Sequence, residues 1–307
     1  MHKIFIDGSA GTTGLRIRER LSQRRDIELM ILPDELRKDP AARRDMLNKS
    51  DISFLCLPDA AAVEAVSLID NPDTVVIDTS TAHRTADGWT YGMPELTGLR
   101  EELTRATRIA NPGCHASGFI ALVRPLVEAG LIKPDAMLSC FSLTGYSGGG
   151  KKMIAEYEDQ DRSPLLDAPR IYALGQAHKH LPEMQKLCGL AHEPVFSPIV
   201  AAYYSGMEVS VTLTRELLSC SLDTIKTAYR DYYRDGMIRY DDSTEGGFIS
   251  AGAFSGRDDM VVAAFGNDDR VTLISRFDNL GKGASGAAIQ NMNIRLGLAE
   301  ATGLVTG

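Results

Sequence analysis

The 307-residue sequence has no long hydrophobic run, no closely spaced cysteine pair and no excess of positive charge. No stretch approaches the roughly 20 apolar residues that a membrane-spanning helix needs. A strand pattern begins almost at the first residue, so we expect no cleaved signal peptide. These absences predict a soluble, cytoplasmic protein with no membrane partner.

Charge and cysteine content exclude further classes. The 33 basic residues are outnumbered by 41 acidic ones, for a net charge of −8. Nucleic acids and membrane surfaces require a positive field, so we expect no nucleic-acid partner. The five cysteines are odd in number and scattered, which is typical of reduced thiols rather than of a disulfide framework. The length suggests two domains of roughly 100 to 200 residues each.

The first part of the chain alternates short apolar runs with helical patterns, which predicts parallel strands joined by helices. The strands are expected at Lys3–Ile6, Ile27–Leu32, Ile52–Leu57, Thr74–Asp78 and Arg108–Ala110, and the helices at Gly14–Leu21 and Ala60–Ile69. This pattern indicates an α/β nucleotide-binding domain of the Rossmann type, ending near residue 113.

The second part has a different periodicity. Strict apolar-polar alternation over Val209–Thr214, and two strands flanking Asn267–Asp269, predict a mixed or antiparallel sheet. One face is expected on helices, and the other in water or at an interface. The helices are expected at 116–130, 217–233 and 284–300. We therefore predict an α+β catalytic domain after the first one.

A glycine-rich loop lies directly between the first strand and the first helix. Its residues are Gly8, Ser9, Ala10, Gly11, Thr12, Thr13 and Gly14. Glycines permit a tight turn and a close approach of phosphate to the backbone, and a helix N-terminus offers N–H groups. The position predicts dinucleotide binding, and the alternative is an ordinary flexible turn.

The choice between NAD and NADP stays open from the residues after the second strand. Asp34 stands where an acid would bind the ribose hydroxyl of NAD, whereas Arg37 or Lys38 could hold the 2′-phosphate of NADP.

The most informative cysteine is Cys114, in the segment Asn111-Pro112-Gly113-Cys114. The turn places this thiol near a helix N-terminus, where the dipole favours the thiolate and backbone N–H groups can hold an oxyanion. We predict that Cys114 is a nucleophile. The other cysteines, at 56, 140, 188 and 220, are expected to be small buried residues.

A thiolate nucleophile needs a proton-transfer partner, for which His178 and His180 are candidates. They precede a helix whose first turn contains Pro182, and at a spacing of two they project to the same side. Metal ligation is the alternative, but no further ligand has a usual zinc spacing, so we expect no metal. His83 and His115 are candidates by position only.

Two other segments are candidate anion sites. The glycine-rich turn Gly145–Lys151 follows an apolar strand and could hold phosphate on its backbone, or could be a close packing point. Arg84 follows the fourth strand, at the end of a parallel sheet where ligands bind.

Together these segments resemble the short form of the N-acetyl-gamma-glutamyl-phosphate reductases. The resemblance rests on motifs that run in order along nearly the whole chain, at Gly8–Gly14, Asp78–Arg84, Tyr91–Glu95, Asn111–Cys114, Gly145–Gly150, His178–Glu183 and Asp278–Asn293. Asn-Pro-Gly-Cys is shared with aspartate-semialdehyde dehydrogenases, and the histidine and Asp278–Asn293 motifs are narrower.

The resemblance implies that the last helix belongs to the first domain, so that residues 1–113 with 284–307 bind NADP(H) and residues 114–283 form the catalytic and oligomerisation domain. It implies a homo-oligomer, dimer or tetramer. Cys114 matches the nucleophile, one of His178 and His180 the acid/base, and Asn111 is expected to help hold the oxyanion. The cofactor contacts are expected at the glycine loop, Arg37, Ser80, Ser147, Gly148 and Asn279, and the substrate contacts at Arg84 and Glu183.

The implied reaction is the NADPH-dependent reduction of N-acetyl-gamma-glutamyl phosphate, an acyl phosphate, to N-acetylglutamate semialdehyde in arginine biosynthesis, with release of phosphate. One departure is that Pro198–Gly206 lacks an arginine that the long-form enzymes carry. The alternatives are an aspartate-semialdehyde dehydrogenase, a non-catalytic NADPH-binding sensor and a scaffold subunit.

Overall fold

The computed structural model describes residues 1–307, which form two compact units. The first unit comprises Met1–Pro112 and Ala284–Leu304, and the second comprises Gly113–Gly283 and Val305–Gly307. None of the helices has both the length and the apolar composition required to cross a bilayer.

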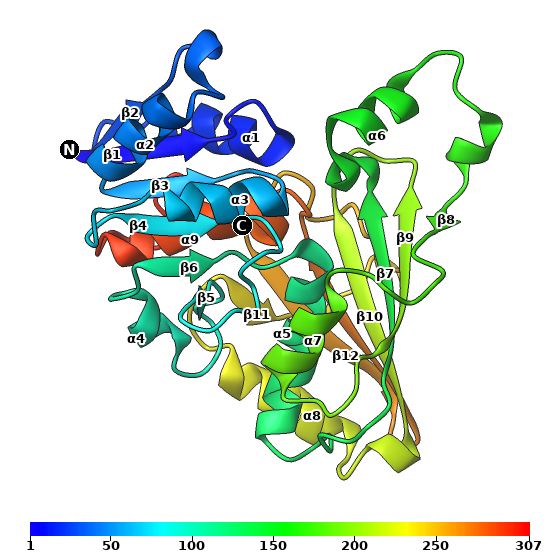
Figure 1. The fold of residues 1–307 in the computed structure, drawn as a ribbon. Helices are drawn as coiled ribbons and strands as arrows, with labels where there is room; N and C mark the ends of the chain where they lie inside the picture. Colours follow the sequence, from blue (N-terminus) through cyan, green and yellow to red (C-terminus); the bar gives the residue numbers. More distant parts are fainter. The chain divides into compact units, whose positions relative to one another are not determined.

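The first unit is built on a parallel sheet, as predicted (Figure 1). Its six strands follow the order β2-β1-β3-β4-β6-β5. They are β1 (His2–Asp7), β2 (Ile27–Met30), β3 (Ile52–Leu55), β4 (Val75–Asp78), β5 (Thr90–Tyr91) and β6 (Arg108–Ala110). β1 lies between β2 and β3, so the glycine loop leaves the sheet from a central position. Both β2 and β3 end two residues earlier than their apolar runs predict.

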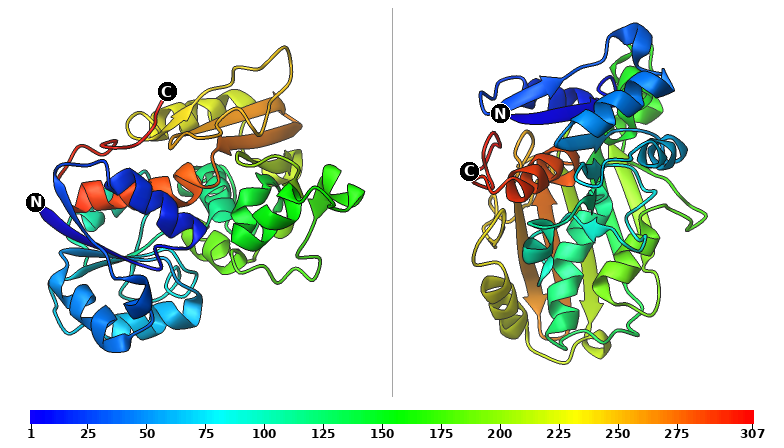
Figure 2. Two further views of the ribbon diagram at one scale, coloured as in Figure 1. Left: turned by 90° about the horizontal axis from the view of Figure 1, so that it is seen from above. Right: turned by 60° about the vertical axis from the view of Figure 1, so that its left-hand side comes forward.

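Helices cover both faces of this sheet. On one face, α1 (Thr12–Leu21) and α9 (Gly286–Arg295) share a core with the strands, and Figure 2 shows α9 lying along this sheet. On the other face, α2 (Pro40–Lys49) and α3 (Asp59–Ser67) form a second core. A short helix, α4 (Leu99–Leu103), contacts α9. The sequence patterns did not predict α2, although its start has a clear signal, because the Asp39 side chain accepts from the Ala42 N–H and Pro40 follows it.

The second unit has a seven-stranded mixed sheet in the order β11-β12-β13-β10-β7-β9-β8. The strands are β7 (Ser139–Gly145), β8 (Arg170–Ile171), β9 (Val195–Ala201), β10 (Met207–Thr214), β11 (Ile238–Tyr240), β12 (Met260–Asn267) and β13 (Arg270–Phe277). The predicted hairpin joins β12 to β13. The helices are α5 (Cys114–Glu128), α6 (Gly150–Glu158), α7 (Leu181–Cys188) and α8 (Leu222–Tyr232), with α5 packed on β10 and β13. Single helical turns occur at Asp34–Leu36 in the first unit, at Tyr146–Gly149, Pro164–Asp167 and Arg215–Leu217 in the second, and at Gly281–Ser285 where the chain returns to the first.

One face of this second sheet is open along part of its width. In β10 the residues alternate between buried and more exposed positions, which confirms the predicted one-sided burial. Phe141 and Val195 lie on the open side and are 45% and 50% exposed. The expectation is wrong for the first half of β12, where both faces are buried. There Arg276, the register partner of Val261, lies against the Phe254 ring, so the segment before β12 covers this end of the sheet.

None of the five cysteines forms a disulfide, but only two of the four expected to be buried are so. Cys140 and Cys188 are buried, whereas Cys56 and Cys220 have intermediate exposure. Cys56 lies just after β3 rather than within it, and Cys220 lies in the turn before α8. Both positions are at strand or helix ends, where apolar runs overestimate burial.

Candidate functional site

The glycine loop of the first unit turns so tightly that only glycine fits at its two ends, Gly8 and Gly14. Gly8 has φ of +89°, and a Cβ there would lie 2.2 Å from the Cys56 carbonyl oxygen. A Cβ on Gly14 would lie 2.4 Å from the Gly8 carbonyl oxygen. The backbone therefore turns back on itself before α1 begins. This close packing explains the glycines at both ends of the loop.

The N-terminus of α1 fits a bound anion. Gly11 caps the helix without a side-chain hydrogen bond, and the first turn carries no acidic residue. The Thr12 hydroxyl is buried and has no hydrogen-bond partner. Unpaired helix N–H groups and the positive end of the dipole favour phosphate. The chemistry of these donors fits the pyrophosphate of a dinucleotide.

A cavity of about 360 Å³ opens beside this loop. Asp7 and the glycine loop line one side of it, and the segment after β2 lines the other. Arg37 reaches the cavity and forms an ion pair with Asp34, with 3.3 Å between the guanidinium and the carboxylate. Lys38 lines the same cavity. The residues considered for the ribose hydroxyl and for the 2′-phosphate thus lie together.

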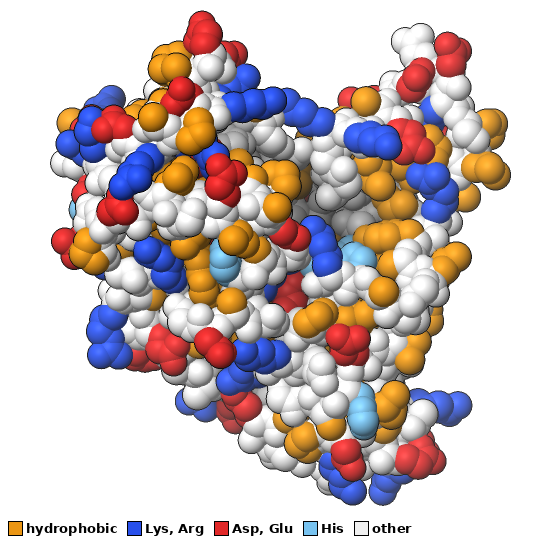
Figure 3. All heavy atoms as spheres, in the orientation of Figure 1, with side chains coloured by type: hydrophobic (Ala, Val, Ile, Leu, Met, Phe, Trp, Pro, Cys, Tyr) orange, Lys and Arg blue, Asp and Glu red, His pale blue; other side chains and the backbone are white.

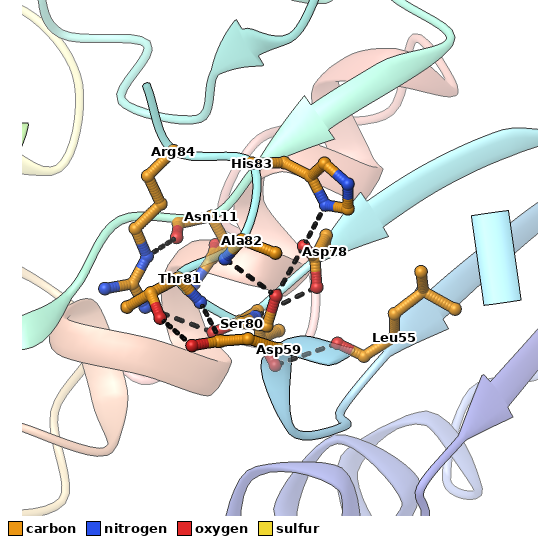
Figure 4. A network of polar contacts seen from close by, with 10 residues as sticks. Leu55, Asp59, Asp78, Ser80, Thr81, Ala82, His83, Arg84 and Asn111 are labelled. Atoms are coloured by element: carbon orange, nitrogen blue, oxygen red, sulfur yellow. Dashed lines mark hydrogen bonds and ion pairs between the residues drawn. The ribbon is translucent and has the colours of Figure 1, made fainter. Parts of the chain in front are cut away.

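The loop after β4 is held by two carboxylates, as Figure 4 shows. Asp78 accepts from the backbone N–H and the hydroxyl of Ser80 and lies 2.6 Å from His83 Nδ1. Asp59 accepts from the backbone N–H and the hydroxyl of Thr81. The His83 ring also stacks on Trp89, with 4.0 Å between centroids. His83 is therefore built into the loop scaffold, and Ser80 is 8% exposed.

Arg84 and Asn111 connect the ends of neighbouring strands in the first unit. The Arg84 guanidinium donates to the carbonyl oxygens of Thr79 and Asn111 (Figure 4). The Asn111 side-chain amide donates to the Ala284 carbonyl oxygen and its oxygen accepts from Asn291. Both residues stabilise the backbone that leads to Cys114, three residues after Asn111 along the chain.

Cys114 begins α5, with Gly113 as the N-cap residue. No side chain caps this helix, and its first turn has no acidic residue. Gly283 lies against the nucleophile candidate, since a Cβ there would come within 2.9 Å of the Cys114 Cβ. The thiol thus has intermediate exposure at a helix N-terminus, where anionic sulfur and a developing oxyanion are favoured.

Three histidines gather in the second unit. The ring centroids of His178 and His180 are 4.7 Å apart, and each is 5.6 Å from that of His115. His178 Nδ1 accepts from the His180 backbone N–H, which places the proton of a neutral His178 ring on Nε2. The predicted pair is thus joined by a third histidine that the sequence indicated by position only.

His115 is held in the neutral form. Its Nδ1 lies 2.7 Å from the Ser142 hydroxyl and its Nε2 lies 2.8 Å from the Tyr172 hydroxyl. Burial, followed by the charge of His178, lowers the pKa of His115 from 6.5 to about 3. Burial and the neighbouring Cys114 raise the pKa of Tyr172. An imidazole whose pKa lies this far below neutral suits a structural link better than proton exchange near neutral pH.

Glu183 is buried between the residue before Cys114 and the His180 ring and does not face solvent. It is 1% exposed, and its Oε2 accepts from the Gly113 backbone N–H at 3.2 Å. Its Oε1 lies 3.9 Å from His180 Nε2. The carboxylate therefore links the residue before Cys114 to one histidine of the pair. The contacts of Glu183 with Gly113 and of Tyr172 with His115 had no local sequence signal, because they join residues 70 and 57 positions apart.

The other predicted cofactor residues of the second unit form a separate cluster. The Asn279 amide nitrogen donates to the Ser147 hydroxyl at 3.0 Å, and its oxygen accepts from the Gly206 N–H at 2.9 Å. Gly148 lies beside the same amide, because a Cβ added to Gly148 would lie 3.3 Å from the Asn279 amide nitrogen. Asn279 is 2% exposed, so its side chain holds the glycine-rich turn in position.

No group of three or more histidine, cysteine or acidic side chains is arranged to hold a metal ion. Acidic and basic side chains are interspersed on the face drawn in Figure 3.

Comparison with known proteins gives consistent results. Residues 9–106 match the model for the semialdehyde dehydrogenase NAD binding domain, and residues 114–279 that for the semialdehyde dehydrogenase dimerisation domain. N-acetyl-gamma-glutamyl-phosphate reductase 2 of Nostoc sp. is 44% identical, over 98% of this chain and 99% of that protein. The N-acetyl-gamma-glutamyl-phosphate reductase of Brucella suis is 44% identical, over 96% and 99%. That of Burkholderia cenocepacia is 42% identical, over 97% and 98%.

Solved structures of the same fold include two aspartate semialdehyde dehydrogenases. Enzyme II of Vibrio cholerae, complexed with ASA, has a TM-score of 0.72 at 14% identity, over 96% of this chain and 98% of that one. The enzyme of Candida albicans with NADP has a TM-score of 0.70 at 14% identity, over 97% and 100%. At these identities the likeness shows the fold alone.

Proposed function

The chain belongs to the N-acetyl-gamma-glutamyl-phosphate reductase family of semialdehyde dehydrogenases, and from this we propose that it reduces N-acetyl-gamma-glutamyl phosphate to N-acetylglutamate semialdehyde. The cofactor is NADP(H), and phosphate is released. The reaction is a step of arginine biosynthesis. The enzyme is thus a phosphorylating, NADP-dependent oxidoreductase.

The observation that carries this proposal is the position of Cys114 at the start of α5, in the same unit as the histidine pair. The thiolate attacks the acyl carbonyl, a carbon–sulfur bond forms, and the bond to the phosphate oxygen breaks with release of phosphate. Backbone N–H groups at the helix start stabilise the oxyanion during this attack. The product is a thioester on Cys114.

The second half of the reaction requires reduction and proton transfer. NADPH, held by the glycine loop and Arg37, would supply the hydride, and reduction of the thioester gives a thiohemiacetal. The His178/His180 pair protonates the oxyanion of the thiohemiacetal and takes this proton back as the carbon–sulfur bond breaks, which releases the aldehyde and regenerates the thiolate. Glu183 orients His180 and the Gly113 backbone, so we assign it a positioning role instead of a substrate contact. Separate His178→Asn and His180→Asn variants distinguish the members of the pair.

The remaining residues are assigned to cofactor or substrate contacts by their position and chemistry. The glycine loop and Arg37 hold the cofactor, and Ser80, Ser147 and Gly148 lie in turns suited to contact it. Asn279 positions the Ser147 turn. We retain Arg84 as a contact for a substrate anion and Asn111 as an aid to the oxyanion, because a guanidinium and an amide suit these charges.

The test follows reduction of NADP in the reverse direction by the absorbance of the reduced nicotinamide. Wild type, Cys114→Ala and Cys220→Ala each receive N-acetylglutamate semialdehyde or aspartate semialdehyde, with and without phosphate. Phosphate-dependent turnover of the acetylated substrate, lost in Cys114→Ala and kept in Cys220→Ala, is expected. Turnover of aspartate semialdehyde alone would contradict the proposed acetylated substrate. An active Cys114→Ala variant would contradict the proposed covalent step.

We propose further that the open side of the second sheet forms a homo-oligomer contact. Phe141 and Val195 lie on this side with about half of their surface exposed, and this unit matches a dimerisation domain. Burial of such side chains between two copies removes apolar surface from water. A dimer or tetramer is therefore expected. Because none of the five cysteines forms a disulfide, the cytoplasm is the expected compartment.

A further inference from the structure

A buried carboxylate lies at the root of the glycine loop. Asp7 is the last residue of β1, directly before Gly8, and is 4% exposed. It also lines the cavity beside the loop. A negative charge at this position repels the phosphates of a dinucleotide, because low-dielectric surroundings screen it little. The cavity therefore needs a compensating charge.

Arg43 provides this charge from beneath the loop. It comes from α2, is 6% exposed, and donates from Nε to Asp7 Oδ2 at 3.0 Å. Its Nη2 lies 2.9 Å from the same oxygen. Glu64 of α3 lies 3.6 Å from Nη1 but is 53% exposed on its side chain. Solvent thus screens the Glu64 contact, and the Asp7 contact is the strong one.

The other charges around the cavity do not replace Arg43. Asp34 and Glu35 oppose Arg37 and Lys38, so these four side chains cancel in formal charge. With Asp7 included, the residues that line the cavity carry a net charge of about −1, and Arg43 neutralises this charge through its contact with Asp7.

The groups that face Asp7 are few. Burial raises the pKa of Asp7, Arg43 lowers it, and Glu64 raises it. The Cys56 thiol, near Asp78 and Asp7, stays neutral, because desolvation of its sulfur raises its pKa to about 12 although part of the residue is exposed. Removal of Arg43 therefore leaves no cation facing Asp7, and the carboxyl ionises only at higher pH.

We propose that Arg43 acts as a positioning residue for NADP(H) binding. The Arg43 side chain neutralises Asp7 and holds the end of β1, so that the glycine loop can accept the cofactor phosphates. The proposal rests on the placement of NADP(H) at the glycine loop. Arg43, which does not itself line the cavity, thereby affects the pH dependence of cofactor binding.

The test measures the NADPH dissociation constant by equilibrium titration at about pH 6 and about pH 9, values that bracket the ionisation of a buried carboxyl. The variants are Arg43→Met, Arg43→Lys and the double variant Asp7→Asn with Arg43→Met. Arg44→Met is the matched control, because Arg44 is the next residue of α2, is 57% exposed and pairs with Asp70. Circular dichroism establishes that each variant is folded.

Arg43→Met is expected to bind NADPH about tenfold more weakly than wild type at the higher pH and within about threefold of wild type at the lower pH. Arg43→Lys restores part of the loss, and the double variant binds within about threefold of wild type at both pH values. If Arg43→Met does not fold, the double variant decides: pH-independent binding supports the proposal, and lost binding overturns it.

Two other results would overturn it. Arg43→Met that binds like Arg44→Met at both pH values would show that the charge has no effect. A loss that is equal at both pH values and is not restored by Asp7→Asn would show a purely structural role. Failure of the wild type itself to bind NADPH would instead contradict the proposed cofactor placement.

Discussion

Glu183→Gln tests whether a buried carboxylate positions the catalytic pair. The substitution keeps the size of the side chain and one acceptor oxygen but removes the charge. Glu183 is 1% exposed and lies between the Gly113 N–H and the His180 ring. Because no solvent reaches this carboxylate, water cannot replace its charge, and the imidazolium form of His180 loses its counter-charge.

The expected loss follows from the contacts. At 3.9 Å the Glu183–His180 contact is an ion pair and not a hydrogen bond. An opposite charge at about this distance favours the protonated ring by about 1.4–4 kcal/mol. Its loss corresponds to a decrease in kcat of about 10-fold to about 1000-fold. KM is expected to change little, because Glu183 does not face the substrate. The acid limb of the pH–rate profile is expected to move to lower pH, since the protonated ring is less favoured.

The assay is the reverse reaction with N-acetylglutamate semialdehyde and phosphate, with kcat and KM measured across pH. Glu193→Gln is the matched control, because Glu193 is an exposed glutamate of the same unit. A kcat within about twofold of wild type, with an unchanged pH profile, would refute the positioning role. A loss confined to KM would instead indicate a direct substrate contact.

Three further outcomes are expected. Gly8→Ala should cost about 2–4 kcal/mol in unfolding free energy and abolish NADPH binding, because φ is +89° and a backbone oxygen would lie 2.2 Å from the new Cβ. The control Gly88→Ala, with open space around it, should cost only about 1–2 kcal/mol, and equal melting temperatures of the two variants would contradict this. The pKa of His115 is lowered from 6.5 to about 3, so below about pH 6.5 the unfolded state binds more protons and the free energy of unfolding decreases as pH falls. Between about pH 7.5 and pH 5, urea unfolding should show that wild type loses about 2 kcal/mol more of this free energy than His115→Gln, and equal losses would contradict the buried neutral ring. Phe141→Glu should dissociate the oligomer in light scattering, whereas Leu165→Glu, 76% exposed and outside the sheet, should leave it intact; an unchanged mass for Phe141→Glu would exclude this face.

Local patterns in the sequence determined the parts of this protein whose physical causes are local. Alternating strand and helix periods identified the parallel sheet, because burial on both sheet faces leaves continuous apolar runs. Glycine spacing identified the loop before α1, since only glycine tolerates the backbone approach at Gly8. The Pro112-Gly113 turn placed Cys114 at a helix start, and Pro182 did the same for the residues after the histidine pair.

Only the tertiary structure decided how these local features are supported. The carboxylate of Glu183 reaches Gly113 across 70 residues, and Tyr172 reaches His115 across 57. Arg43 reaches Asp7 from a helix that periodicity did not reveal, because α2 is largely polar and buries only Arg43 and Leu47. Hydrogen bonds and ion pairs between distant residues leave no periodic trace in a sequence, because their geometry exists only once the strands and helices have packed.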